Sequence, residues 1–195
     1  PIATRNHRAA SLAFLRLEPA GAHVLPLGAQ ARQLSLSVAN DLRRHVQGPL
    51  EVHEDAETTR LVLTWRRGIG HGSEWGVEVP VLGRGGGAFD PLIDAWHRHV
   101  LKWSDPLRDA TPFGRSEVTY PGSPSRGSAA GLGDVTLGAA RRLGGEWVVR
   151  AALKLPTGRG SELLGSEAPD LGLSLDWSRP LGREWLLYAH GAIVL

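Results

Sequence analysis

Residues that could do chemistry gather in the stretch GGGAFDPLIDAWHRHV, residues 85–100. Three glycines lead into Asp90, Asp94 and His97, which are spaced i, i+4 and i+7. On a helix these side chains would share one face, as two carboxylates and an imidazole do in some metal sites. The spacing therefore makes a metal centre one interpretation of this stretch.

The same residues also have structural roles in a helix over about 90–103. Asp90 directly before Pro91 is typical of an N-cap followed by proline at the first helical position. Asp94 and Arg98 form an i, i+4 pair, which stabilises a helix by roughly 0.2–0.5 kcal/mol. Because both carboxylates then have structural work, we predict a helix here and expect no bound metal.

The glycines before this helix fit a loose dinucleotide-binding pattern, since GRGGGA (83–88) reads G-x-G-x-x-A. A dinucleotide loop opens straight into its helix, so that the first amides meet the pyrophosphate. Here a carboxylate and a proline stand at that place. We therefore expect no cofactor. No G-x-S-x-G or H-E-x-x-H pattern occurs either, and we nominate no catalytic residue.

The elements that must position these residues are mainly strands, because apolar residues recur with period two along most of the chain. The pattern predicts strands over 33–40, 59–67, 74–82, 133–142, 147–156, 171–178 and 185–195, the last of them apolar throughout.

The connections between these strands alternate in length. The short ones are 68–73, 143–146 and 179–184, and the long ones are 41–58, 83–132 and 157–170. Tight turns at one end and long loops at the other are typical of an antiparallel up-and-down meander. We expect one domain over 1–195, with an irregular segment over 1–30 and barrel strands over 31–195.

Tryptophans mark the short-turn end of this meander. Five of the seven tryptophans stand one to three residues from a short connection, namely Trp65, Trp75, Trp147, Trp177 and Trp185. Transmembrane β-barrels carry such girdles of aromatic side chains where hydrocarbon meets water. The fold class that we predict is therefore an all-β transmembrane β-barrel, with one amphipathic helix in a long loop. A soluble antiparallel barrel that binds an apolar ligand, with its apolar face inward, stays open as the alternative.

The alternation also assigns the two faces of the predicted barrel. The lipid face would carry Leu61, Leu63, Val77, Val79, Leu153, Leu155, Leu173 and Leu175. The lumen face would carry Arg60, Arg66, Glu74, Glu78, Asp134, Arg150, Lys154 and Asp176. Mixed charges suit either a narrow polar pore or cross-strand ion pairs that close it.

The predicted helix has an apolar stripe at helical spacing that includes Phe89, Trp96 and Trp103. The connection that contains this helix, 83–132, is too long for a simple turn. We expect the helix to fold over or into the barrel mouth, with these three side chains packed on barrel residues.

Composition excludes several other classes. There is no cysteine, so disulfides and thiolate metal sites are excluded. A net charge of +2 with interleaved signs argues against a nucleic-acid surface. The chain starts at Pro1 and stops in an apolar run, so we expect a piece of a longer protein, truncated at both ends, whose export signal has been removed.

Several phrases resemble a family of uncharacterised Gram-negative outer-membrane proteins that share a domain of unknown function. They are PIATRN at the start, SVAN (37–40), EDAETTRLVLTWRRGI (54–69), EWGVEVPVL (74–82), GGGAFDPLIDAWHRHV (85–100), GLGDVTLGA (131–139) and LKLPTGRGSELLGSEAPDLG (153–172). The resemblance implies a β-barrel in the outer membrane. The chain departs from the family at Glu167, where glycine is usual.

Together these patterns lead us to expect an outer-membrane β-barrel in contact with the lipid bilayer. A passive, porin-like channel for small-molecule solutes is the leading hypothesis for its function. An outer-membrane enzyme and an adhesive barrel stay open beside it, and the patterns do not address the oligomeric state.

Overall fold

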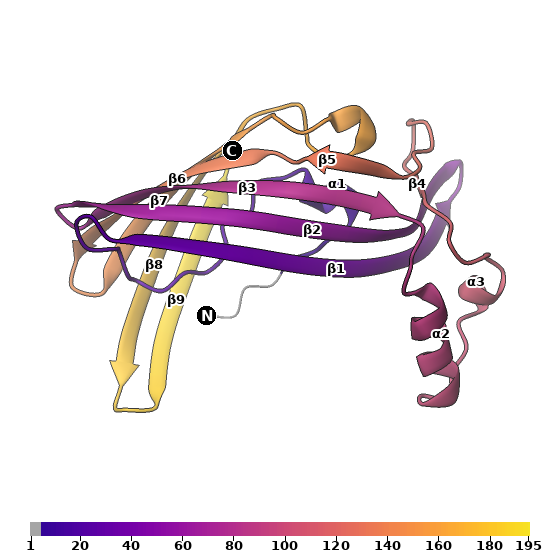
Figure 1. Ribbon diagram of the computed structural model, residues 1–195, viewed down its shortest axis with the longest axis horizontal. Coiled ribbons are helices and arrows are strands. Elements are labelled where there is room, and N and C mark those ends of the chain that lie inside the picture. The colour runs from indigo at the N-terminus through magenta and orange to yellow at the C-terminus, as the bar shows by residue number, and fades with distance from the viewer. Residues whose placement is uncertain (1–4) are drawn as a thin grey trace.

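The computed structural model describes residues 5–195, and within them one antiparallel sheet dominates. Its strands pair in the order β1 (Gln30–Gln47), β2 (Leu50–Gly70), β3 (Ser73–Gly85), β6 (Val135–Gly144), β7 (Trp147–Leu155), β8 (Asp170–Leu181) and β9 (Trp185–Val194). Two short strands extend it, since β4 (Glu117–Thr119) pairs with β2 and β5 (Ala129–Leu132) pairs with β3. Strands β8 and β9 run at a steep angle to β1–β3, so the sheet curls like half of a barrel (Figure 1). The predicted all-β antiparallel meander is confirmed at this level.

The first predicted connection is wrong. Residues 41–58 form no long loop, because β1 and β2 stay paired from Gln30↔Arg67 to Gln47↔Leu50. Gly48, with a φ of 58°, makes the tight turn between them. Charged and polar side chains occur on both faces here, so the alternation that reveals a strand fades while the backbone ladder continues.

The helices are short and lie outside the sheet. They are α1 (Ala9–Leu12), α2 (Asp90–His99), α3 (Pro106–Asp109) and the 3-10 turn η1 (Gly160–Glu162). Figure 1 shows α2 and α3 at the end of the molecule opposite the β2–β3 and β6–β7 turns. Among residues 5–195, no helix has both the length and the apolar character that a membrane span requires.

The start of α2 differs from the prediction. Asp90 is the first helical residue, Phe89 holds the cap position, and no side chain caps the helix. The Asp90 carboxylate instead accepts a 2.5 Å bond from Asn40 Nδ2. A second Asp-Pro pair does what was expected of the first, since Asp105 accepts a 2.9 Å bond from the Leu107 amide and caps α3. The same dipeptide therefore caps a helix only where no outside donor competes for the carboxylate.

Two adjacent rows of paired residues show how the sheet divides into faces. Side chains alternate between faces along each strand and match across strands. One row is apolar and runs Trp65, Val77, Leu137, Leu153, Leu171. The next row is polar and runs Thr64, Glu78, Thr136, Lys154, Asp170. We call the face that carries the apolar row the outer face, and the opposite one the inner face.

The apolar core is small and lies on the inner face. Three clusters hold most of the buried apolar side chains, and each includes one residue from the segment before β1: Ala9 with Ala56 and Val118, Leu12 with Leu82 and Leu164, and Ala22 with Ala140 and Val148. The core therefore forms where the segment of residues 5–27, here called the N-terminal segment, meets the sheet.

Candidate functional site

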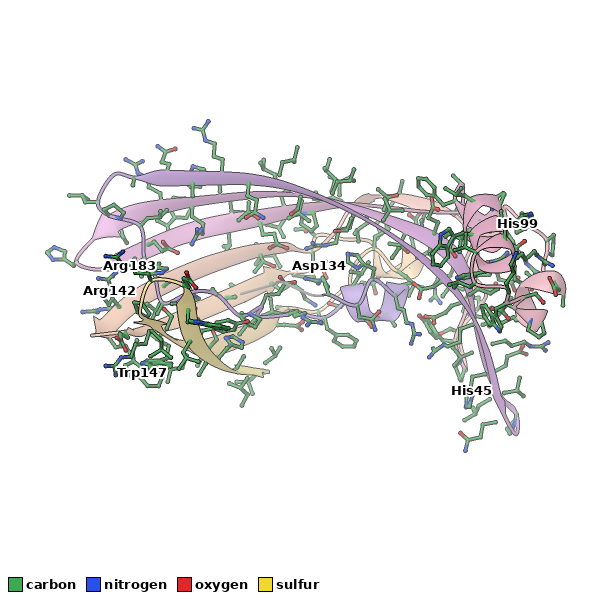
Figure 2. The ribbon with its side chains drawn as sticks, turned by 90° about the horizontal axis from the view of Figure 1, so that it is seen from below. His45, His99, Asp134, Arg142, Trp147 and Arg183 are labelled. Atoms are coloured by element: carbon green, nitrogen blue, oxygen red, sulfur yellow. The ribbon has the colours of Figure 1, made fainter. Side chains whose placement is uncertain are left out.

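The charged residues predicted to line a lumen all lie on the inner face. They are Arg60 and Arg66 on β2, Glu74 and Glu78 on β3, Asp134 before β6, Arg150 and Lys154 on β7, and Asp176 on β8. Four are basic and four acidic, so the set is formally neutral. Figure 2 shows Asp134 well inside the molecule, between the end marked by Arg142, Trp147 and Arg183 and the end marked by His45 and His99.

Arg150 connects two carboxylates from different strands. Its Nη1 lies 3.2 Å from Glu74 Oε1, and its Nε lies 3.1 Å from Asp176 Oδ2. Arg66 adds a second cation at 2.9 Å from Glu74, and His190 on β9 lies 2.9 Å from Asp176 Oδ1. Asp176 is fully buried, so this network must hold its charge without help from water.

A second network centres on Lys154, which is also buried. Its Nζ lies 2.7 Å from Asp170 Oδ2 and 3.6 Å from Asp134 Oδ2. The same ammonium donates to Ser166 Oγ at 2.6 Å, so its donors are well used. Asp134 in turn accepts the backbone amides of Gly158 and Ser166, both at 2.9 Å, and so fixes the loop between β7 and β8.

The N-terminal segment follows the inner face and bonds to these networks through its backbone. Its amides at residues 15, 20, 22 and 25 donate to Asp170 (2.7 Å), Asp176 (3.2 Å), Ser178 (3.1 Å) and Glu74 (2.8 Å). Its carbonyls at residue 13 and at residues 21 and 23 accept from Lys154 and Arg150. Side chains of the sheet thus take the place of a neighbouring strand in satisfying this backbone.

One glycine on the inner face allows the segment to come close. A Cβ at Gly172 would lie 2.8 Å from Cδ1 of Leu17 and 2.9 Å from Cδ2 of Leu15. Any larger residue would push these side chains away from β8. The shape of the inner face is therefore matched to the N-terminal segment, as its charges are.

Space remains between the segment and the sheet. A cavity of about 210 Å³ is lined by Arg5, Arg16 and Glu18 of the segment and by Arg60, Glu78 and Lys154 of the sheet, among others. Arg60 and Glu78 are joined at 2.5 Å across its wall. Such a space can hold a few water molecules or a small polar solute.

The outer face has the opposite character. In the described residues nothing covers its leucines, and Leu61, Leu63, Leu153, Leu173 and Leu175 are between 38% and 50% exposed. Leu34, Leu36 and Val38 of β1 continue this apolar surface beside β2, where Leu34 pairs with Leu63 and Leu36 with Leu61. Patches much larger than a few hundred Å² are rare on the surfaces of soluble monomers.

The five tryptophans near the short turns form a staircase on the outer face. One row of paired residues runs from Trp75 through Ala139, Ala151 and Leu173 to Ile193. On the later strands the tryptophan lies nearer to the short turn than this row does. The separation is four residues from Ala151 to Trp147 on β7, four from Leu173 to Trp177 on β8, and eight from Ile193 to Trp185 on β9. On β2, Trp65 lies two residues short of Arg67, the partner of Trp75. The offset therefore grows by about two residues per strand from β2 to β9.

At the long-loop end, Tyr120 ties the N-terminal segment to β2. Its hydroxyl donates to Glu54 Oε1 at 2.5 Å and accepts the Ala10 amide at 3.2 Å. Burial, together with the bond to the Glu54 carboxylate, raises the pKa of Tyr120 to about 12. Arg43 Nη2 lies 3.1 Å from the other oxygen of Glu54 and balances its charge.

The loop that carries α2 and α3 is held to the other side of the same strands. Arg108 donates to Asp55 Oδ1 at 3.1 Å and lies 3.3 Å from Asp90 Oδ2. The Phe89 amide donates to Glu57 Oε2 at 3.1 Å. Asp55 and Glu57 alternate with inner-face residues of β2, so α2 and α3 are anchored on the outer side.

The three residues considered for a metal site are not gathered around one point. Asp90 faces Asn40 and Arg108, while Asp94 pairs with Arg98 at 2.8 Å as the i, i+4 spacing predicted. The His97 ring lies 5.2 Å from that of Trp103. Within residues 5–195, no group of three histidine or acidic side chains could hold a metal ion.

The apolar stripe of α2 does not rest on the strands, where the sequence led us to expect it. Phe89, Trp96 and Trp103 are 48%, 51% and 51% exposed. The reason is the anchoring by Asp90 and Arg108, which turns the polar side of the helix start towards β1 and β2.

Sequence reasoning missed part of the inner face. Asp170 and Ser178 are an even number of residues from Asp176 along β8, so the alternation could have placed them on the inner face as well. His190 lies on a strand that is apolar on both faces, and only its pairing with Asp176 reveals its orientation. The N-terminal segment has no periodicity, so nothing in its own residues indicated where it binds.

Comparison of the sequence with protein-family models, and with curated proteins, gave no match.

Proposed function

We propose that this chain forms part of the wall of an outer-membrane β-barrel that conducts small polar solutes past its N-terminal segment. The observation that carries the proposal is the assignment of the two faces of the sheet. Charged side chains are buried on the inner face, while leucines are exposed on the outer face. A lipid environment stabilises this arrangement, because hydrocarbon accepts apolar side chains and excludes charges.

The soluble alternative needs the reverse arrangement. A soluble barrel that binds an apolar ligand places its apolar side chains inside, where they form the core or line the ligand cavity. The inner face here carries Glu74, Lys154 and Asp176 in ion pairs. An apolar ligand would have to displace or desolvate these charges, which is costly.

The tryptophan staircase supports the membrane proposal from a second direction. Two residues along a strand correspond to roughly 6.6 Å, and strands lie roughly 4.8 Å apart. A line through the tryptophans that shifts by this amount per strand makes an angle of about 54° with the perpendicular to the strands. Strands of membrane barrels tilt by roughly 35–45°, so tilting the sheet in the same sense removes most of the height difference between the tryptophans. That level would be the interface on the short-turn side.

Lipid also sets a condition on the whole protein. The described residues leave one edge each of β1 and β9 unpaired. Open edges do not persist in hydrocarbon, because their amides and carbonyls find no partner. The proposal therefore requires additional strands that pair with β1 and β9 and close the barrel.

The location is tested by fractionating Gram-negative cells that express the complete gene. Recovery in the outer membrane, with a folded band that changes mobility on boiling, is the expected result. Recovery in the soluble fraction without a heat-dependent shift would overturn the proposal.

Transport is tested by recording from the full-length protein in planar bilayers. Arg150→Gln removes the donors to the carbonyls of Gly21 and His23, so we expect a looser N-terminal segment and higher conductance. Arg159→Gln is the matched control, because Arg159 lies in the β7–β8 loop and binds Ala130 and Glu162 there. Absence of conductance from both the natural protein and Arg150→Gln would remove the channel and leave only the barrel.

A further inference from the structure

Helix α2 and the residues that flank it present an apolar stripe that no described part of the chain covers. Leu92 and Trp96 belong to the helix, whereas Phe89, Val100 and Trp103 stand outside its ends, and all five are between 48% and 65% exposed. The opposite side of the helix is polar and satisfied, since Arg98 pairs with both Asp94 and Asp109. Exposed apolar surfaces of this kind mark sites of contact with protein or membrane.

The anchor determines which side of the sheet the stripe belongs to. Glu57 and Asp55, which hold the Phe89 amide and Arg108, lie on the same face of β2 as Leu61 and Leu63. Glu57 is four residues from Leu61, or roughly 13 Å along the strand. The helix is therefore fixed on the outer side of the sheet, just past the end of its apolar surface.

The orientation of α2 fits that position. In Figure 1 its axis runs across the direction of β1–β3 and extends past the edge of β1. At a strand tilt of about 40°, an axis that crosses the strands lies closer to the membrane plane than to its normal. Helices in a membrane interface lie along that plane, with their apolar side towards the acyl chains.

The tryptophans give an independent observation. Five of the seven form the staircase at the short-turn end, and the other two, Trp96 and Trp103, belong to this stripe. On β2, Trp65 and Glu57 are eight residues apart, roughly 26 Å along the strand. At a strand tilt of about 40° that distance rises roughly 20 Å, close to the roughly 25 Å apolar band of membrane barrels. Trp65 and the point where the Phe89 amide is anchored to Glu57 are thus separated by most of the thickness of that band.

We infer that α2 lies in the headgroup–acyl boundary of the leaflet at the long-loop end, with its stripe inserted among the lipids. The inference rests on the proposed membrane location and adds a lipid-binding element outside the strands. The stripe continues the lipid-facing surface of β2, and indole rings prefer this boundary because they are apolar with one polar edge.

Residues 1–195 contain no cysteine, so single cysteines can be placed among them as unique labelling sites in this part of the protein. Single cysteines are introduced into the full-length protein at Leu92, Val100, Ala95 and Leu63, and each is coupled to a nitroxide. Leu92 and Val100 report on the stripe, whereas Ala95 is exposed on α2 outside it and serves as the matched control. Leu63 is the reference for the outer face. The protein is placed in phosphatidylethanolamine–phosphatidylglycerol vesicles, and collision with oxygen is compared with collision with a water-soluble nickel chelate.

The expected result is preferential collision with oxygen at Leu92→Cys, Val100→Cys and Leu63→Cys, and with the nickel chelate at Ala95→Cys. Chelate access at both stripe positions, with lipid exposure at Leu63→Cys, would overturn the inference and leave the barrel intact. Protection of the stripe from both reagents would also overturn it, because a protein surface such as a second copy would then cover it. Chelate access at Leu63→Cys would instead overturn the proposed membrane location.

Discussion

The inner and outer faces of one sheet are stabilised in different ways. On the inner face, burial follows contact with the N-terminal segment, and the most buried side chains include Asp176 and Lys154. On the outer face, leucines are exposed although nothing about their chemistry favours water. Side chains of the sheet are therefore buried where the N-terminal segment covers them. The distribution of apolar side chains instead indicates which surroundings each face suits.

The two faces therefore respond to substitution differently. A buried ion-pair network is satisfied as a whole, and removing one member leaves a charge without a partner. An exposed leucine can be replaced by another apolar residue at little cost, yet a charge in its place is costly in lipid. Neighbouring residues on one strand offer matched pairs for testing this contrast.

The largest expected effect is on the inner face. Lys154→Met removes the cation that lies between Asp170 and Asp134, so both carboxylates stay buried without it. We expect a loss of about 3–5 kcal/mol in the free energy of unfolding, measured by denaturant titration of the refolded full-length protein in lipid. Leu153→Met, one residue away on the outer face, should cost less than about 1.5 kcal/mol. Equal losses of unfolding free energy in the two variants would mean that the two faces do not differ in how they are stabilised.

The next effect is on the outer face and depends on the surroundings. Leu63→Arg puts a charge among the exposed leucines and should destabilise the protein in bilayers by about 2–4 kcal/mol. Thr64→Arg puts the same charge beside the inner-face cavity, where Glu78 lies opposite in the register, and should cost far less. Folding yield and unfolding free energy are measured in lipid for both. If Leu63→Arg behaves like Thr64→Arg, the outer face does not meet hydrocarbon.

A smaller effect concerns the place where the inner face meets the N-terminal segment at the long-loop end. The pKa of Tyr120 is raised to about 12, so the folded state prefers the neutral phenol. This contribution to stability is complete below the ordinary tyrosine pKa of about 10 and is lost as the pH rises from there towards 12. The phenolate would stand beside the Glu54 carboxylate and repel it.

The prediction is checked by following unfolding free energy across that pH range in the natural protein and in Tyr120→Phe. The natural protein should lose more stability than the variant, and ultraviolet titration should show one late-ionising tyrosine that Tyr120→Phe lacks. Parallel stability curves would mean that the bond to Glu54 contributes nothing to the folded state.

Alternation predicted the sheet well because each face of a strand has a uniform environment over its central residues. Whether a residue is odd or even along its strand was enough to assign the eight charged residues to the inner face and the exposed leucines to the outer face. Alternation did not predict the strand where polar residues occur on both faces, as at Asp41 and Arg44, where β1 continues beyond its apolar part. There the backbone ladder decides the structure, and side-chain type carries no signal.

The partners of the inner face could not be predicted, because they come from distant parts of the chain. Leu15 and Asp170 are 155 residues apart, and Ala22 and Ser178 are 156 apart. The bond in each case involves a backbone amide, which every residue but proline offers. The side to which the α2 stripe points could not be predicted for a related reason. The ion pair of Arg108 with Asp55 fixes the position of the loop, and neither residue belongs to the helix.

The smallest expected effect lies in the β7–β8 loop, which closes over Asp134. Glu167 adopts a φ of 60° there, in the left-handed region that costs most residues about 1–2 kcal/mol. Glycine adopts this conformation freely but loses more entropy on folding. Glu167→Gly should therefore raise the free energy of unfolding by only about 0.5–1 kcal/mol, measured as a shift in the denaturant midpoint. Glu167→Ala keeps the Cβ and should give no gain. A gain in the alanine variant as large as in the glycine variant would assign the effect to the lost carboxylate and not to the backbone.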